Sequence, residues 1–244
     1  IVEKNRLKNQ QLAQLCGGQS FIAQAPVNLI FLLDWHKLAV YSRKNNAPFT
    51  CNKSFRHYTI AMDDIVCAAQ SVETAAWLYG IGSCYVGTIL ECIPAVAEMY
   101  KLPMLAAPVL LLSLGYPKTL AVPRKKLDQD LVVFRGAYPA LSVEKISEAY
   151  DRKYSGMRFS LPADPHKRQV LLEEFRAALR TTYNESKCDE IIQAADKAGS
   201  ISEIQRRFGL HYHAAEMLSP DVIEGLASQG IYPFYGLLEQ DPER

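Results

Sequence analysis

Residues 61–87, AMDDIVCAAQSVETAAWLYGIGSCYVG, carry the strongest structural signal in the chain. Apolar residues recur there at helical spacing and predict a helix over residues 62–79. A Gly-x-Gly turn follows at residues 80–82, and residues 83–87 are typical of a short strand. Because glycine has no Cβ and tolerates positive φ, the turn leaves backbone amides bare, and a flat polar ring could lie against them. For a glycine pair taken alone, a helix C-cap before a core strand is the simpler interpretation.

The composition is that of an ordinary globular protein. Of the 244 residues, 49% are hydrophobic and 22% are charged, and the formal net charge is +1. Such a charge creates no overall basic field for nucleic acid or an anionic membrane. The longest apolar runs, such as residues 106–114, are too short to span a bilayer, and no signal peptide is recognisable. We therefore expect a cytoplasmic protein that binds neither nucleic acid nor membrane.

The cysteines and the first residues lead to two further expectations. The six cysteines form no CxxC pair and have no regular spacing, which favours free thiols in a reducing compartment. We expect Cys67, Cys84 and Cys92 to act as small core residues. The chain opens on Ile1-Val2-Glu3 without an initiator methionine or a capping signal, like the tail of a strand. We expect a segment that precedes it to be missing.

The composition changes at about residue 145, which predicts a core over residues 1–145 and a helical extension over 146–244. In the core, helices are expected over 5–16, 19–24, 62–79 and 88–100, the last entered near Ile93-Pro94. Strands are expected over 25–34, 83–87, 104–114 and 131–134. Residues 35–60 are expected to form a long polar and aromatic connection. In the extension no strand is evident, and helices are expected over 165–180, 186–197, 202–208 and 220–228.

Several common chemical motifs are absent. The glycine segment fails the dinucleotide fingerprint G-x-G-x-x-G, because Tyr85 stands at the third glycine position and the glycines follow a helix. The sequence contains no phosphate-binding P-loop, HExxH motif, zinc-spaced Cys/His cluster or G-x-S-x-G elbow. We therefore assign no catalytic residue and no metal ligand.

A basic connection follows the strand predicted over 104–114. Arg124, Lys125 and Lys126 come directly after Pro123, and cations held by a rigid sheet can grip a phosphate. Three basic residues in a loop are more often a solvated surface.

Four segments, in this order, resemble the FMN-dependent nitroreductase family. They are APVNLIFLLD (25–34), the segment 61–87, KLPMLAAPVLLLSLGYP (101–117) and PRKKL (123–127). The resemblance covers roughly the first 150 residues and leaves the helical tail outside the common family pattern. It implies an α+β fold, with a central mixed or antiparallel sheet flanked by helices, followed by the α-helical extension.

The resemblance also implies a cofactor and a partner. Members of this family hold FMN at the interface of a homodimer. By analogy, Arg124 and Lys126 would contact the FMN phosphate, and Gly18 and Gln19 would approach the pyrimidine side of the ring. The isoalloxazine would lie along the segment formed by Ser83, Cys84, Tyr85, Val86 and Gly87, with Gly87 near flavin N5. The family's Arg-rich phosphate motif and its Ser-x-x-Asn contact would fall before residue 1, which makes the chain N-terminally incomplete.

The implied activity is that of an FMN-dependent oxidoreductase. NAD(P)H would reduce the flavin, and a small conjugated acceptor, such as a nitroaromatic or a quinone, would take the electrons in a ping-pong hydride-transfer cycle. Two alternatives stay open. Residues 200–218 look like a helix-turn-helix in which Arg206 and Arg207 could meet phosphates, which would suit a nucleic-acid-binding or regulatory protein. The chain could also be an inactive flavin-fold binding protein.

Overall fold

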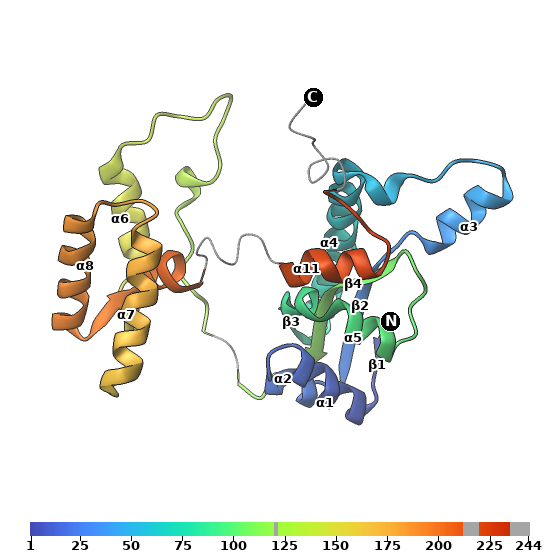
Figure 1. The fold of residues 1–244 in the computed structure, drawn as a ribbon, viewed down its shortest axis with the longest axis horizontal. Helices are drawn as coiled ribbons and strands as arrows, with labels where there is room; N and C mark the ends of the chain where they lie inside the picture. Colours follow the sequence, from blue (N-terminus) through green and yellow to red (C-terminus); the bar gives the residue numbers. More distant parts are fainter. Residues whose placement is uncertain (120–121, 212–219, 235–244) are drawn as a thin grey trace. The chain divides into compact units, whose positions relative to one another are not determined.

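Four antiparallel strands form the central sheet of the first part of the chain (Figure 1). They are β1 (Val2–Glu3), β2 (Val27–Asp34), β3 (Gly82–Val86) and β4 (Ala106–Gly115), in the order β1-β2-β4-β3. The pairing places Leu111 of β4 opposite Ile30 on one side and Val86 on the other. The apolar runs that predicted strands over 25–34, 83–87 and 104–114 therefore form the sheet as expected.

The computed structural model describes residues 1–119, 122–211 and 220–234. Contacts divide the chain into two compact units, Ile1–Leu120 with Ser219–Arg244, and Ala121–Leu218. The expected core boundary after residue 145 lies inside the second unit, and the helix near the C-terminus belongs to the first. We describe each unit by itself.

Helices cover the sheet of the first unit. They are α1 (Arg6–Leu15), α2 (Ser20–Gln24), α3 (His36–Lys44), α4 (Phe55–Leu78), α5 (Ile93–Met99) and α11 (Pro220–Ser228), with short 3₁₀ turns η1 (Cys51–Lys53) and η2 (Thr88–Cys92). The Asn5 side chain caps α1 by accepting hydrogen bonds from the amides of Leu7 and Lys8. The helices expected over 5–16, 19–24 and 220–228 are confirmed. The helix expected over 88–100 becomes α-helical at Ile93, where its entry was expected, and the 3₁₀ turn η2 precedes it.

The expected connection over residues 35–60 is wrong. It contains α3, η1 and the first turns of α4, which the Ser54 side chain caps by accepting from the His57 amide. The many aromatic residues and Pro48 argued against a helix in this stretch. In the structure Pro48 lies between α3 and η1 and interrupts neither of them.

The core of the first unit has two apolar clusters. One brings α1, α2, η2 and α5 onto β2, β3 and β4, and the other brings α11 and the first half of α4 onto β2 and β4. The fully buried members include Leu12, Cys16, Ile22, Ile89, Leu111, Ile93, Leu226 and Ile231.

Helix α4 is only thinly covered. Ala69 and Ala76 are its buried residues, while Trp77 is 71% exposed and Val66 is 49% exposed. Of the apolar residues whose spacing predicted this helix, Ala68, Ala75 and Tyr79 are exposed. The prediction that Cys67 and Cys84 are core residues is also wrong, since both thiols are exposed and Cys92 is only half-buried. A helical period locates an apolar face, but it does not show whether the same chain covers that face.

The second unit has its own small core, made by Leu161, Phe175, Ala195 and Ile201. Its helices are α6 (Val143–Lys153), α7 (Pro165–Leu179), α8 (Glu185–Ala198) and the single turn α9 (Glu203–Arg206), with a 3₁₀ turn η3 (Gln129–Leu131) and a π-helical turn η4 (Arg207–His211). The helices expected over 165–180 and 186–197 are confirmed.

Two expectations for this unit are wrong, and a third holds in part. The extension does contain strands, because β5 (Arg158–Ser160) pairs antiparallel with β6 (Ser200–Ser202). Residues 131–134 form no strand and continue from η3 into irregular backbone. The helix expected over 202–208 is one α-helical turn followed by the π-helical turn η4.

Candidate functional site

The end of α1 and the start of η2 meet at a polar junction. The Gln19 side chain donates from Nε2 to the Cys16 carbonyl at 2.7 Å and to the Thr88 hydroxyl at 3.0 Å. The Thr88 hydroxyl in turn donates to the Cys16 carbonyl at 3.3 Å. These bonds hold the predicted residues Gly18 and Gln19 beside the predicted Gly87, across 69 positions of sequence. We call Cys16, Gly18, Gln19, Gly87 and Thr88 the junction.

The backbone at the junction faces open space. Gly18 adopts a φ of +72°, which favours glycine, and a Cβ built there would meet no atom within 4 Å. Gly87 has φ −80°, and a Cβ there would also meet nothing within 4 Å. A planar ring could therefore approach the main chain at both glycines, as expected of a flavin site.

Strand β3 borders the junction and lies at the end of the sheet order, paired with β4 alone. The Ser83 hydroxyl donates to Glu73 at 3.2 Å, and the Tyr85 hydroxyl donates to the Gln70 side-chain oxygen at 3.4 Å. Val86 is buried in the core. Since the side chains of Ser83 and Tyr85 are tied to α4, an edge strand of this kind offers a ligand chiefly its backbone.

Two side chains of β3 titrate, and both stay neutral at physiological pH. Burial, together with the Glu73 charge, raises the pKa of Tyr85 above its usual value of 10.0. Partial desolvation also raises the pKa of the Cys84 thiol. Neither group therefore supplies a charge to the site.

A second group of predicted residues lies in the second unit. Arg124 and Lys126 line a basic hollow of about 610 Å³. The other residues that line it are Lys125, Lys153, Tyr154, Gly156, Met157, Arg158, Glu203, Arg206 and Arg207. Glu203 is its one carboxylate, and hydrogen bonds from Arg206 and Arg207 lower the pKa of that carboxyl to about 2. Seven cationic side chains around one carboxylate make a hollow suited to an anion.

Sequence reasoning missed several residues of this basic hollow. Lys153, Tyr154 and Arg158 come from the end of α6 and the start of β5, about thirty positions after Arg124. The Tyr150 and Tyr154 rings stack with centroids 6.1 Å apart, and Lys153 Nζ lies 5.3 Å from the Tyr154 ring centre. No local pattern links these positions to the PRKK segment, so only the fold reveals the cluster.

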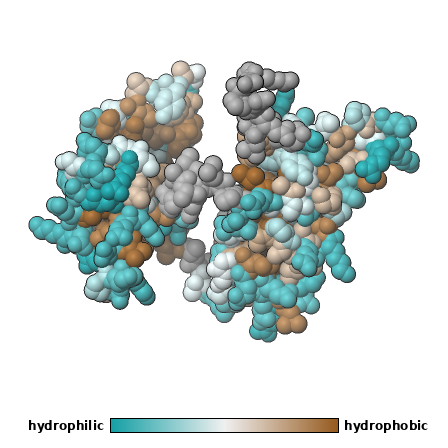
Figure 2. All heavy atoms as spheres, viewed as in Figure 1, coloured by the Kyte–Doolittle hydropathy of each residue, from teal (hydrophilic) through white to brown (hydrophobic). Residues whose placement is uncertain are grey.

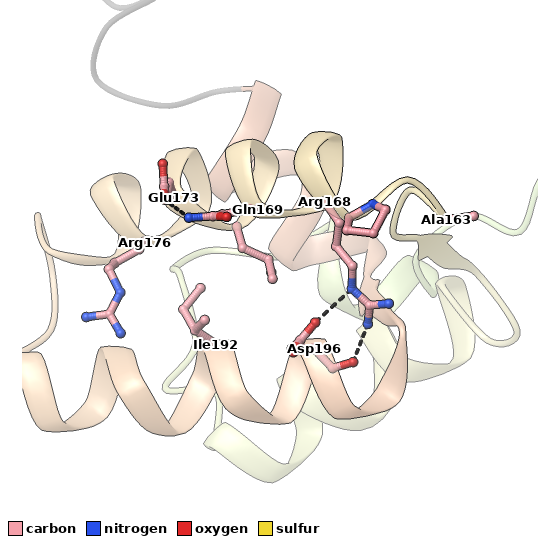
Figure 3. Close-up of a pocket in the computed structure, with 9 residues that line it drawn as sticks. Ala163, Arg168, Gln169, Glu173, Arg176, Ile192 and Asp196 are labelled. Atoms are coloured by element: carbon pink, nitrogen blue, oxygen red, sulfur yellow. Dashed lines mark hydrogen bonds and ion pairs between the residues drawn. The ribbon is translucent and has the colours of Figure 1, made fainter.

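Figure 3 shows a different hollow, a groove between α7 and α8. Its polar side chains are already paired. Arg168 Nε lies 2.7 Å from an Asp196 oxygen, and Gln169 donates to Glu173 at 2.9 Å. We interpret this groove as the seam between two packed helices.

Two kinds of site find no support within the described ranges. No group of three His, Cys, Asp or Glu side chains in residues 1–119, 122–211 and 220–234 could hold a metal ion. No helix of that part of the chain combines the length and apolar character that a bilayer crossing needs.

Comparison with known proteins gives one consistent answer. Residues 1–116 match the nitroreductase family. The chain is 28% identical over 179 residues to an oxygen-insensitive NADPH nitroreductase of Salmonella typhimurium, covering 70% of this chain and 72% of the relative. It is 28% identical over 145 residues to an NADPH-flavin oxidoreductase of Vibrio harveyi, covering 59% of this chain and 58% of the relative. The chain thus spans less than two thirds of the Vibrio protein.

Solved structures agree on the fold. NfrA2 of B. megaterium superposes with a TM-score of 0.63 at 22% identity, covering 95% of this chain and 79% of that one. The NADPH:FMN oxidoreductase of Vibrio harveyi, solved with NAD+, superposes with a TM-score of 0.57 at 20% identity, covering 82% and 78%. At such identities the likeness establishes the architecture.

Proposed function

We propose that this chain, whose residues 1–116 match the nitroreductase family, is an FMN-dependent oxidoreductase. It uses NAD(P)H to reduce small conjugated acceptors such as nitroaromatics or quinones. The relatives support this proposal, since their names specify NADPH, flavin and nitro compounds. The observation that carries it is the junction, where Gln19 joins Thr88 and two glycines leave the backbone open.

The chain's own residues bind and orient the cofactor. The backbone at Gly18 and Gly87 and the edge strand Ser83–Val86 would hold the isoalloxazine ring. Arg124 and Lys126 would hold the phosphate, since charge-assisted hydrogen bonds to phosphate are strong. FMN, when bound, supplies the acceptance of hydride from NAD(P)H and its transfer to the acceptor. The protein needs no acid or base of its own for this chemistry.

We further propose that the active form is a homodimer with FMN at the subunit interface. Helix α4 supports this, because it is apolar on average yet mostly exposed over 24 residues. Large exposed hydrophobic patches on a protein mark interaction sites. Exposed hydrophobic residues also appear among hydrophilic ones on the face shown in Figure 2. A second copy that packs on α4 would remove this surface from water.

We place the protein in the cytoplasm, which suits the six free cysteines. The structure does not support the main features of the alternative hypothesis, a helix-turn-helix that binds nucleic acid. Residues 200–202 form a strand, and Arg206 and Arg207 both pair with Glu203, at 2.9 and 2.8 Å. The second helix of that motif, over residues 212–218, lies outside the described residues.

The test is flavin binding followed by turnover. Purified protein, reconstituted with FMN, should retain a yellow chromophore and oxidise NAD(P)H faster when a nitroaromatic or quinone is added. Replacing both Arg124 and Lys126 with Ala should weaken FMN binding by about tenfold or more, because two charged phosphate contacts are lost. Lys118→Ala is the matched control, since this basic residue precedes the same connection but does not line the basic hollow.

Three results would count against parts of the proposal. A folded protein that never retains FMN refutes the cofactor assignment. FMN binding without NAD(P)H oxidation identifies the inactive flavin-fold alternative. If the double variant and the Lys118→Ala control bind FMN with equal affinity, Arg124 and Lys126 do not contact the cofactor.

A further inference from the structure

Hydrogen bonds at the junction fix the orientation of the Gln19 side-chain amide. A backbone carbonyl only accepts hydrogen bonds, so the Gln19 atom that lies 2.7 Å from the Cys16 carbonyl must be Nε2. Nε2 gives its second hydrogen to the Thr88 hydroxyl at 3.0 Å, and that hydroxyl donates its own proton to the Cys16 carbonyl at 3.3 Å. These three groups form a closed ring of hydrogen bonds, which we call the clamp, and every proton in it has an acceptor.

The clamp leaves the side-chain oxygen of Gln19 as the free atom of the amide. Within residues 1–119, 122–211 and 220–234, the hydrogen bonds of this side chain all leave from Nε2, and none reaches Oε1. Gln19 is half-buried, and Oε1 is not among the buried polar atoms that lack a partner, so a ligand can reach it. Gln19 therefore offers a ligand an acceptor and no donor.

The backbone on both sides of the clamp is held by other hydrogen bonds. The Ile22 amide donates to the Gln19 carbonyl at 3.1 Å, and the Leu90 amide donates to the Gly87 carbonyl at 3.0 Å. Neither bond involves the Thr88 hydroxyl. Removing that hydroxyl should therefore free the side-chain amide while the main chain stays in place.

We propose that Thr88 is a positioning residue, which keeps the Gln19 amide turned so that Oε1 accepts a hydrogen bond from the N–H of a bound flavin ring. This role rests on the proposed function, because the ligand it requires is FMN. The oxidised isoalloxazine has a single N–H, at N3 on its pyrimidine side, where the family resemblance places Gln19. An amide turned the other way would set its own N–H against N3–H, two donors without an acceptor. A side chain that is fixed before the ligand arrives also loses less entropy on binding.

The affinity for two flavins, measured by fluorescence titration, tests the role of Thr88. In 3-methyl-FMN a methyl group replaces the N3 hydrogen, so this analogue has no hydrogen to give to Oε1. The parent protein should bind FMN about tenfold or more tightly than 3-methyl-FMN, because the analogue loses one hydrogen bond. Thr88→Val keeps the shape of the side chain and should lower this ratio about threefold or more, by weakening FMN binding alone. Thr88→Ser keeps the hydroxyl and should keep the ratio.

Two further variants serve as references. Thr181→Val removes a hydroxyl that likewise donates to a backbone carbonyl, that of Ala178, and should leave the ratio unchanged. Gln19→Leu removes the acceptor itself and should lower the ratio at least as far as Thr88→Val does; it decides the question if Thr88→Val does not fold. If the methyl group blocks binding to every variant, NMR of isotope-labelled FMN replaces the ratio. Bound N3–H should then exchange with water faster in Thr88→Val than in Thr88→Ser.

Separate outcomes distinguish the failure of this role from the failure of the proposed function. In the cofactor-free protein, the Gln19 side-chain amide protons should exchange slowly with water by NMR, and faster in Thr88→Val; equally fast exchange in both would overturn the clamp. Equal losses of affinity for both flavins in Thr88→Val would show that Thr88 only supports the fold, and would overturn the role, as would unchanged affinities. A folded parent protein that binds neither flavin refutes the FMN site, and the role of Thr88 with it.

Discussion

Among the glycines of the second unit, Gly209 leaves the least room for a side chain. It lies buried in the π-helical turn η4, and a Cβ added there would overlap the ring of the fully buried Phe175. We expect Gly209→Ala to lower the free energy of unfolding by about 1–3 kcal/mol, the usual cost of overpacking a core. Urea denaturation followed by circular dichroism measures it. Adding Phe175→Leu should recover part of the loss, and strictly additive effects of the two changes would contradict the overlap.

Glu203 gives the second unit a defined acid sensitivity. Hydrogen bonds from Arg206 and Arg207 lower the pKa of its carboxyl to about 2, from a usual value of 4.5. A lowered carboxyl pKa stabilises the fold above the unfolded-state pKa, and this contribution is lost as the pH falls from about 4.5 to about 2. Glu203→Gln should therefore show a smaller drop in thermal midpoint over this range. If the thermal midpoints of variant and parent fell by the same amount over this pH range, these ion pairs would not support the fold.

Elements differ in how far the sequence reveals them. Long apolar runs predicted β2 and β4, because a buried strand must be apolar on both faces. Strands β5 and β6 have three residues each, too few for any period to be visible, and their pairing spans some forty positions. In the candidate site, the glycine segment was visible locally. The Gln19–Thr88 contact and the cations that surround Arg124 depend on packing that no local pattern encodes.

Helix α4 is the element that the dimer proposal depends on. If a second copy covers it, charges placed on its exposed side should separate the subunits, because a buried unpaired carboxylate is costly. We expect Trp77→Glu combined with Val66→Glu to convert a dimer into a folded monomer by light scattering after size exclusion. Asp63→Lys is a control of similar charge change near the N-terminal part of the same helix, at a position that is already polar. A monomeric parent protein, or a dimeric double variant, would contradict the proposal.

At the scale of the whole molecule, the chain leaves the first unit and returns to complete it. Helix α11 packs on α5 and η2, and Gly225 approaches Ile93 so closely that a Cβ would lie 3.0 Å from the Ile93 Cβ. Hydrogen bonds join the end of α11 to distant segments, from the Leu105 amide to the Gln229 carbonyl at 2.8 Å and from Asn52 to the Gly230 carbonyl at 2.9 Å. The first unit therefore depends on residues that follow the second.

This dependence predicts two separable unfolding transitions. Gly225→Val adds a branched side chain against Ile93 and should destabilise the first unit by about 1–3 kcal/mol, while the second keeps its own core. The chain's two tryptophans, Trp35 and Trp77, both belong to the first unit, so their fluorescence reports it alone. We expect the fluorescence midpoint to fall in the variant. The part of the helical circular dichroism signal that comes from α6, α7 and α8 should be lost in a later transition, whose midpoint is the same in variant and parent. A single transition that shifts as a whole would mean that the two units unfold together.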